Sequence, residues 1–322
     1  MDLNTQLTTQ RQMADPVADK AIENIVETLG INYLRESMVH FSDYQSVKIE
    51  DLPPVLQEFI IHNSQFPPFF NKKEIVRATD FYKKNQQQIG LILALYSLPY
   101  CYLGADGARV LCFTERIKND TYRRLKETGE FLKAVMNYDN WHSGAIFTIL
   151  AKVRLLHAAI RYFIWKSARW DNSWGQPINQ EDMLGTNLAF SLIVLRGMEK
   201  LGNTPNTIEK KAYLHTWNCI GILMGINAIN LPVNELAAIK IDKTIGQRQF
   251  KQSTDGQELT ASLMAVIKGF APNELSGNFL QAQSRFLLGN NYAEMLGIKE
   301  TNVPESLLKL YNESAAIFGK IF

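Results

Sequence analysis

Apolar and polar residues alternate along most of this chain with the spacing of an α-helix. Apolar positions recur three and four residues apart, which places them on one face of a helix. This spacing predicts helices over residues 17–38, 52–63, 73–84, 87–97, 120–136, 142–166, 179–201, 207–229, 233–245, 256–268 and 273–297. Only short segments, such as residues 109–114, have a pattern compatible with a strand. The sequence therefore predicts an all-α fold.

Capping residues mark the ends of two central helices. Asn179 precedes Asp182 by three residues, and Asn206 precedes Glu209 in the same way, which is the arrangement of a capping box. Gly202 follows the first of these helices, where a C-terminal cap is expected. Both helices are therefore expected to start at an asparagine.

Glycine and proline divide the pattern further. Pro99 is expected to end the helix over residues 87–97. Gly221 and Gly225, four residues apart, would share a helix face and permit close approach of another helix. Neither a repeat nor a long Gly/Ser/Pro linker divides the chain. We therefore expect a single multi-helix domain over residues 1–322, with a helical extension over residues 1–50.

Composition limits the class of protein. The chain has 322 residues, 46% hydrophobic and 20% charged, which is typical of a globular protein with a sizeable core. A formal net charge of +2 gives no reason to expect nucleic acid or an anionic membrane as partner. The longest apolar runs, residues 89–98 and 219–226, are too short to span a bilayer. Three widely spaced cysteines and the absence of a signal-peptide pattern predict a cytoplasmic protein.

The sequence lacks the familiar short catalytic motifs. It contains no dinucleotide or P-loop glycine pattern, no G-x-S-x-G, no H-E-x-x-H and no C-x-x-C. Helical di-iron oxidases need Glu-x-x-His pairs, and no histidine here has a glutamate three residues before it. The histidines are His40, His62, His142, His157 and His215.

The residues around His157 are the strongest indication of chemistry. Arg154 and Arg161 share a helix face with His157 in an otherwise apolar segment, so this face is expected to be buried. Burying two cations and an imidazole is costly unless they have partners. Haem offers iron for the imidazole and propionates for the arginines, and Ala158 and Ala159 leave room for a flat macrocycle. The alternative is a structural cluster whose partners are carboxylates and backbone.

Other residues have weaker claims to a function. Asp182 is expected to cap a helix, His215 is a second choice as iron ligand, and Cys219 is expected to be a small buried hydrophobe. Four tryptophans near the central helix could line a haem site or a substrate channel, or could serve only in packing. They are Trp141, Trp165, Trp170 and Trp174.

Three segments in order resemble the MpaB-type oxygenase domain, a family that includes the latex-clearing rubber oxygenases. They are residues 154–161, residues 177–191, and residues 209–225 with Tyr213, Trp217 and Gly221. The resemblance covers about residues 88–297 and is strongest over residues 123–225.

The resemblance implies a globin-like helical core that binds haem b. It implies that His157 is the proximal iron ligand and that Arg154 and Arg161 lie at the propionates or in the ion-pair shell that holds them. An upstream Arg-x-x-Lys stretch supplies a distal lysine in this family, and Arg123 and Lys126 match it.

The distal side matches the family less well. Thr128 continues the upstream pattern, and the alternative for this stretch is a solvated basic helix face. Rubber oxygenases use a distal glutamate as base, and no acid stands at the matching place near Gly107. Asp106, Glu115 and Glu127 are nearby, and none is assigned that role.

The resemblance implies a haem b oxygenase that uses O2 on a small apolar, unsaturated substrate. His157 would hold the iron, and Lys126, Arg123 and Thr128 would act on the distal side. The alternatives are a haem-binding sensor, carrier or electron-transfer protein, and a helical protein that binds an apolar ligand without a metal. The substrate, the electron source and the oligomeric state are not encoded in any pattern that we recognise.

Overall fold

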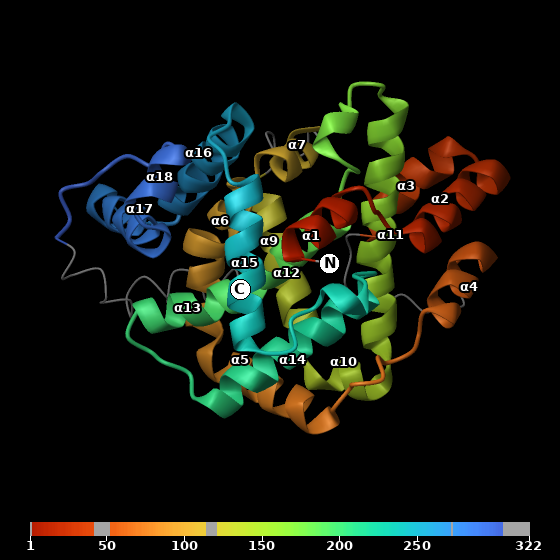
Figure 1. The fold of residues 1–322 in the computed structure, drawn as a ribbon, viewed down its shortest axis with the longest axis horizontal. Coiled ribbons are helices and arrows are strands. Elements are labelled where there is room, and N and C mark those ends of the chain that lie inside the picture. The colour runs from red at the N-terminus through yellow and green to blue at the C-terminus, as the bar shows by residue number, and fades with distance from the viewer. Residues whose placement is uncertain (1, 42–51, 114–120, 272, 305–322) are drawn as a thin grey trace.

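The computed structural model describes residues 2–41, 52–113, 121–271 and 273–304, and these residues fold into helices (Figure 1). They contain no strand, only an isolated bridge between Gly104 and Phe250. The predicted all-α fold class is confirmed, whereas the globin-like core and the single domain stay predictions. The α-helices are α1 Leu3–Arg11, α2 Pro16–Leu29, α3 Ile31–Phe41, α4 Pro54–His62, α5 Lys72–Ile92, α6 Leu98–Tyr102, α7 Ala105–Phe113, α9 Thr121–Val135, α10 Tyr138–Ser143, α11 Ala145–Lys166, α12 Gln180–Phe190, α13 Leu192–Lys200, α14 Thr207–Leu223, α15 Glu235–Gln249, α16 Thr254–Gly269, α17 Glu274–Leu288 and α18 Asn290–Met295.

Several predicted helices are divided in the structure. Gly30 separates α2 from α3, Gly144 separates α10 from α11, and Gly289 separates α17 from α18, each with a φ between 84° and 89°. A left-handed or otherwise positive φ ends a helix, and glycine adopts it without steric cost. The predicted helix over residues 179–201 is divided at Ser191, whose φ of −108° and ψ of −79° depart from the typical values of an α-helix.

In other places the chain stays helical where the sequence predicted a helix end or a strand. The chain continues from α5 through a π-helical turn, Leu93–Ser97, into α6. Pro99 therefore does not end a helix; it lies in the first turn of α6, directly after the π-helical turn. Residues 109–113, expected as a possible strand, belong to α7, and Thr114 lies outside the described residues.

The two expected helix starts are both present, in different forms. Asn206 and Glu209 form a complete capping box at the start of α14. Asn179 accepts a hydrogen bond from the backbone N–H of Asp182, but the Asp182 carboxylate accepts one from the Asn179 side chain (2.7 Å) instead of from its backbone. Gly202 follows α13 with a φ of 83°, as a C-terminal cap requires.

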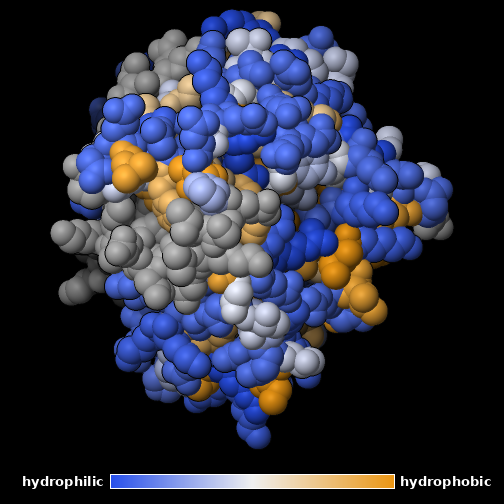
Figure 2. All heavy atoms as spheres, turned by 90° about the vertical axis from the view of Figure 1, so that its left-hand side faces the viewer, coloured by the Kyte–Doolittle hydropathy of each residue, from blue (hydrophilic) through white to orange (hydrophobic). Residues whose placement is uncertain are grey.

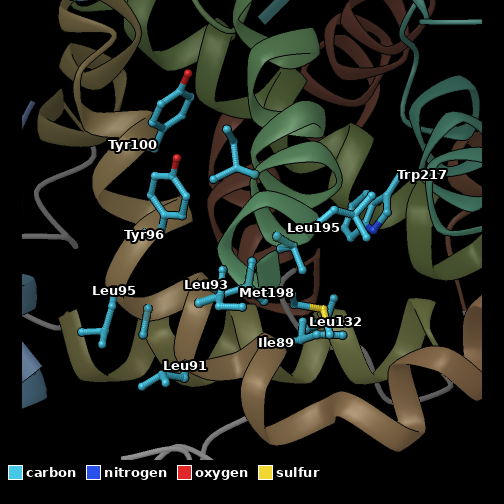
Figure 3. Close-up of a cluster of buried hydrophobic side chains, with 14 of the residues drawn as sticks. Ile89, Leu91, Leu93, Leu95, Tyr96, Tyr100, Leu132, Leu195, Met198 and Trp217 are labelled. Atoms are coloured by element: carbon cyan, nitrogen blue, oxygen red, sulfur yellow. The ribbon is translucent and has the colours of Figure 1, made fainter. Parts of the chain in front are cut away.

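Two apolar clusters organise the helices. The largest is built by α5, α9, α13, α14, α16 and α17. Figure 3 shows part of it, where side chains of α5, α9 and α13, such as Ile89, Leu132 and Met198, meet in the interior. The second joins α2, α3 and α4 to one side of the long helix α11, as Figure 1 shows. The face formed by α16–α18 is mostly hydrophilic where it is coloured (Figure 2). Of the helices described, none is long and apolar enough to cross a membrane.

A buried ion pair attaches the N-terminal helices to α11. Arg154 on α11 pairs with Asp15, the N-cap residue of α2, through both Nε and Nη2. Gly225 lies directly over this pair with a φ of 89°, beyond the end of α14. The prediction that Gly221 and Gly225 share a helix face is therefore wrong, because α14 ends before Gly225. A Cβ at position 225 would lie 2.8 Å from Arg154 Nε, so only glycine leaves room for the pair.

We expect Gly225→Ala to lower the free energy of unfolding by about 1–3 kcal/mol through backbone strain alone, and further through collision with the ion pair. Gly202→Ala is the matched control, because its φ is also positive but nothing lies within 4 Å of the added Cβ. Urea denaturation of both variants measures the two effects. Equal losses of stability in the two variants would show that the Asp15–Arg154 pair tolerates the extra methyl group.

Candidate functional site

A cavity of about 320 Å³ lies among α6, α7, α9, α11, α12, α14 and α15. Its volume is within the range of small-molecule sites, and most of the side chains around it are apolar. Charged or titratable groups interrupt the apolar wall at a few places. These groups are His157, Arg124, Glu181, Asp182 and Asp242, together with Tyr100 and Cys101.

His157 is placed in the wall of this cavity by α11. Burial, reinforced by the positive charges of Arg161 and Arg124, lowers the pKa of His157 from 6.5 to about 4. Its ring is therefore neutral at neutral pH and keeps a lone pair on one nitrogen. The Nδ1 atom is buried and has no hydrogen-bond partner among the described residues. A neutral imidazole in an apolar cavity is a suitable ligand for an iron ion.

The two arginines that flank His157 face α2. Arg154 donates to Asp15 (Nη2 to Oδ1, 2.9 Å) and to the side chain of Asn63 (2.8 Å). Arg161 donates from Nε to Asp19 Oδ1 at 2.7 Å, while its Nη2 is buried and has no hydrogen-bond partner within the part of the chain that the structure describes. The structure thus gives both arginines protein carboxylates, which is the alternative that the sequence left open. Direct contact of either arginine with a cofactor stays a prediction.

On α9 the cavity is reached by Arg124 and not by its predicted neighbours. The Arg123 side chain is half exposed and donates to Glu127 at 2.9 Å. Lys126 is 59% exposed and lies 3.8 Å from Glu130. Thr128 donates to the backbone carbonyl of Arg124 at 2.8 Å. The distal roles predicted for Arg123, Lys126 and Thr128 stay predictions, and in this structure none of the three lines the cavity.

The helical repeat explains this difference. Successive residues of a helix are rotated by about 100°, so residues 124, 128 and 131 share one face and residues 123, 126 and 130 another. Phe131 lines the cavity with Arg124, which identifies the inward face of α9. Arg123 and Lys126 therefore lie on a different face of α9 from Arg124, whereas Thr128 shares the face of Arg124 and its hydroxyl donates to the Arg124 carbonyl.

An acidic wall forms the opposite side of the cavity. Asp182 and Glu181, at the start of α12, both line it. Arg11, the last residue of α1, lies 2.9 Å from Asp182 Oδ1, 3.4 Å from Glu181 Oε2 and 3.6 Å from Asp106 Oδ2. Burial raises the pKa of Asp182, and the charge and hydrogen bond of Arg11 oppose that shift. Arg11 therefore holds the carboxylates of this wall together.

Asp182 lies beside Gly107, the position near which the sequence showed no acid that matches the family's glutamate. A Cβ at Gly107 would lie 3.2 Å from Asp182 Cγ and 3.3 Å from its Oδ1. The carboxyl group of α12 thus fills the space that a side chain on α7 would take. The sequence assigned Asp182 only a capping role, and the structure shows that it caps α12 and faces the cavity at once. Nothing in the sequence signals the contact between positions 107 and 182.

The other candidate acids lie outside the cavity wall or outside the described residues. Asp106 pairs with Arg11 and, at 3.5 Å, with Arg109, and it does not line the cavity. Glu127 pairs with Arg123. Glu115 lies outside the described residues.

The second-choice ligands do not face the cavity. His215 Nε2 accepts a hydrogen bond from the backbone of Asn71 at 3.2 Å, and its ring lies edge-on to Phe69. Cys219 is buried, which raises the pKa of its thiol to about 12, so it is a small hydrophobe as expected. The four candidate tryptophans do not line the cavity either, but Trp217 of α14 does.

The chain resembles known proteins over most of its length. The family model described as "ER-bound oxygenase mpaB/B'/Rubber oxygenase, catalytic domain" matches residues 103–314. A rubber oxygenase from Streptomyces sp. (strain K30) is 26% identical over 261 residues, which are 80% of this chain and 64% of that protein. The match thus spans less than two thirds of that relative. A solved structure of latex clearing protein LCP in the closed state matches 97% of this chain and 83% of that chain, with a TM-score of 0.76 at 22% identity, and so has the same fold.

The lowered pKa of His157 predicts how stability depends on pH. Between pH 6.5 and about 4 the folded protein binds fewer protons at this ring than the unfolded chain does. The contribution of His157 is therefore constant above pH 6.5 and becomes less favourable as the pH falls. We expect wild type to lose roughly 1–3 kcal/mol of unfolding free energy relative to His157→Leu over this interval. Denaturation curves at several pH values test this. A stability difference that does not change with pH contradicts a buried neutral ring.

Proposed function

This chain belongs to the family of MpaB and rubber oxygenase catalytic domains, and from that premise we propose that it is a haem b-dependent oxygenase. It would act with O2 on a small apolar, unsaturated substrate. The observation that carries the proposal is the neutral His157 ring in the wall of a mostly apolar cavity. Family membership alone does not establish this activity for the chain, because the match spans 64% of the rubber oxygenase itself.

The residues around the cavity fit a haem group. His157 offers an uncharged nitrogen to iron, as haem proteins require of a proximal histidine. Arg124 brings a positive charge to the cavity and suits a propionate. Ala108 on α7 and Gly104, which directly precedes α7, line one side of the cavity, where they present little bulk to a flat ring. Bound there, haem would supply the capacity to bind and activate O2.

Asp182 is the group that we propose to hold and transfer a proton in the cavity. Its carboxyl group lies in the cavity wall, and burial raises its pKa. A carboxyl group whose pKa is raised towards neutrality exchanges a proton more readily during a reaction. Arg11 contacts Oδ1 and fixes the orientation of the group. Asp182 would thus take the part of the glutamate that the family places near Gly107.

The remaining residues position these groups and exclude water. Glu181 is completely buried and accepts hydrogen bonds from Arg248 (2.7 Å) and Gln249 (3.0 Å) in addition to Arg11, so it holds α12 against α15. Apolar side chains such as Leu156 and Ile160 flank His157 in the wall. Exclusion of water would protect a reactive intermediate from side reactions.

A haem-binding sensor or carrier is the alternative function. One observation favours it: the Asp182 carboxylate is already engaged by Arg11 and by Asn179. A carboxylate with two partners is a weaker base than a free one. Turnover of an alkene under air distinguishes the two functions.

Haem binding is tested by expression with haem supply. We expect a Soret band in wild type that shifts or disappears in His157→Ala, because the mutation removes the iron ligand. His215→Ala is the matched control, since its ring lies outside the cavity, and its spectrum is expected to equal that of wild type. A colourless wild-type protein, or a His157→Ala spectrum identical to wild type, rules out the proposed site.

The role of Asp182 is tested by Asp182→Asn, which keeps the size of the side chain and a carbonyl oxygen for Arg11. We expect haem binding to persist and oxygen-dependent turnover to fall by roughly 10²–10⁴-fold. Asp106→Asn is the control, because Asp106 pairs with the same arginine but does not line the cavity. Oxygen consumption with a panel of alkenes measures the effect. If Asp106→Asn is impaired as strongly, the loss comes from the Arg11 cluster and not from a proton at Asp182.

A further inference from the structure

A group of tyrosines leads from the cavity towards the surface. Tyr100 on α6 lines the cavity, and its hydroxyl donates to Asp242 Oδ1 at 2.9 Å. Tyr292 on α18 lies with its ring centroid 6.1 Å from that of Tyr100 and is partly exposed to solvent. Tyr96 lies one helical turn before Tyr100, at 5.8 Å, and is buried (Figure 3). The ring of Phe250 packs edge-on against both Tyr100 and Tyr292, with centroid distances of 4.8 Å and 5.5 Å.

The hydroxyl of Tyr100 has a proton acceptor fixed in place. Asp242 is 5% exposed, and Arg196 Nη1 lies 2.7 Å from its Oδ2. Burial raises the pKa of Asp242, and the charges and hydrogen bonds of Arg196 and Tyr100 oppose that shift. The guanidinium group thus favours the ionised carboxylate, which can accept a proton. A phenol loses an electron far more easily when its proton can leave in the same step.

We propose that Tyr100, Asp242 and Tyr292 form a route by which single electrons pass from the protein surface to a strong oxidant in the cavity. The inference rests on the proposed function, because haem that reacts with hydrogen peroxide would be the source of that oxidant. Electrons delivered by this route would reduce the oxidant when it forms in the absence of substrate.

Each electron transfer is balanced. Tyr100 gives one electron to the oxidant, and its phenolic proton moves to Asp242 Oδ1, which leaves a neutral tyrosyl radical and a carboxylic acid. Tyr292 then gives an electron to Tyr100, which recovers its proton from Asp242, while the proton of Tyr292 passes to solvent. A reductant in solution, such as ascorbate, donates a hydrogen atom to Tyr292. Two such cycles reduce one hydrogen peroxide to two waters.

The exposure of Tyr292 favours a route through Tyr100 and Tyr292 over one through Trp217. Trp217 also lines the cavity and can be oxidised, but its aromatic neighbours are Phe190 and the fully buried Tyr213. If Trp217 lost an electron, the nearest residue that could replace it is Tyr213, which lies deeper in the core. Of the tyrosines in ring contact with Tyr100, Tyr292 is the one that reaches solvent.

The test is electron paramagnetic resonance of haem-loaded protein frozen after addition of hydrogen peroxide. We expect an organic radical whose line shape changes when the protein carries ring-deuterated tyrosine. Tyr100→Phe keeps the ring and leaves Asp242 paired with Arg196, and it should lose this radical. Tyr292→Phe should retain the radical and slow its reduction by ascorbate. Tyr82→Phe is the control, because it removes a buried phenol that does not line the cavity, and it should behave as wild type.

The outcomes separate this inference from the proposed function. A protein that takes up no haem, judged by its absorption spectrum, overturns the proposed function and this route with it. A haem-loaded protein with no tyrosyl radical, or with one that survives in Tyr100→Phe, overturns the route alone. A radical unaffected by deuterated tyrosine and lost in Trp217→Phe assigns the oxidation to the tryptophan and also overturns it.

Discussion

Two ion pairs that join α2 to α11, one buried and one partly buried, are the constraint on which the site depends. Arg154 and Arg161 flank His157 at helical spacing, so the helix that carries the histidine into the core must carry two cations with it. Buried cations are tolerated only with carboxylates at hydrogen-bonding distance, and α2 supplies Asp15 and Asp19. The pairs fix α11 against the N-terminal helices, and the charge of Arg161 helps to keep His157 neutral.

Arginines also pair with the carboxylates that line the cavity. Arg11 pairs with Asp182 and Glu181 in the acidic wall, and Arg196 pairs with Asp242. These three carboxylates line a mostly apolar cavity, and the paired arginines reduce the free-energy cost of their desolvation. Arg11 and Asp15 lie before residue 103, where the family match begins. Residues of the N-terminal segment therefore support the site through ion pairs, although none of them lines the cavity.

The sequence predicted what depends on local periodicity and on motifs. The all-α fold, the capping box at Asn206 and the burial of the His157 segment follow from spacing, and the family followed from three segments in order. What it missed depends on contacts between distant positions or on small rotations. The proximity of Asp182 to Gly107 is a tertiary contact, and choosing Arg124 over Arg123 requires knowing which face of α9 is inward.

The central claim is that His157 holds an iron-containing group in the cavity. Crystals of the haem-loaded protein, measured above and below the iron absorption edge, test it most directly, because the anomalous signal locates iron without assumptions about the ligand. We expect a single strong iron peak inside the cavity, about 2 Å from a ring nitrogen of His157, the length usual for a bond between a metal ion and an imidazole. An iron peak bound elsewhere, or a cavity without one in protein that has taken up haem, would contradict it.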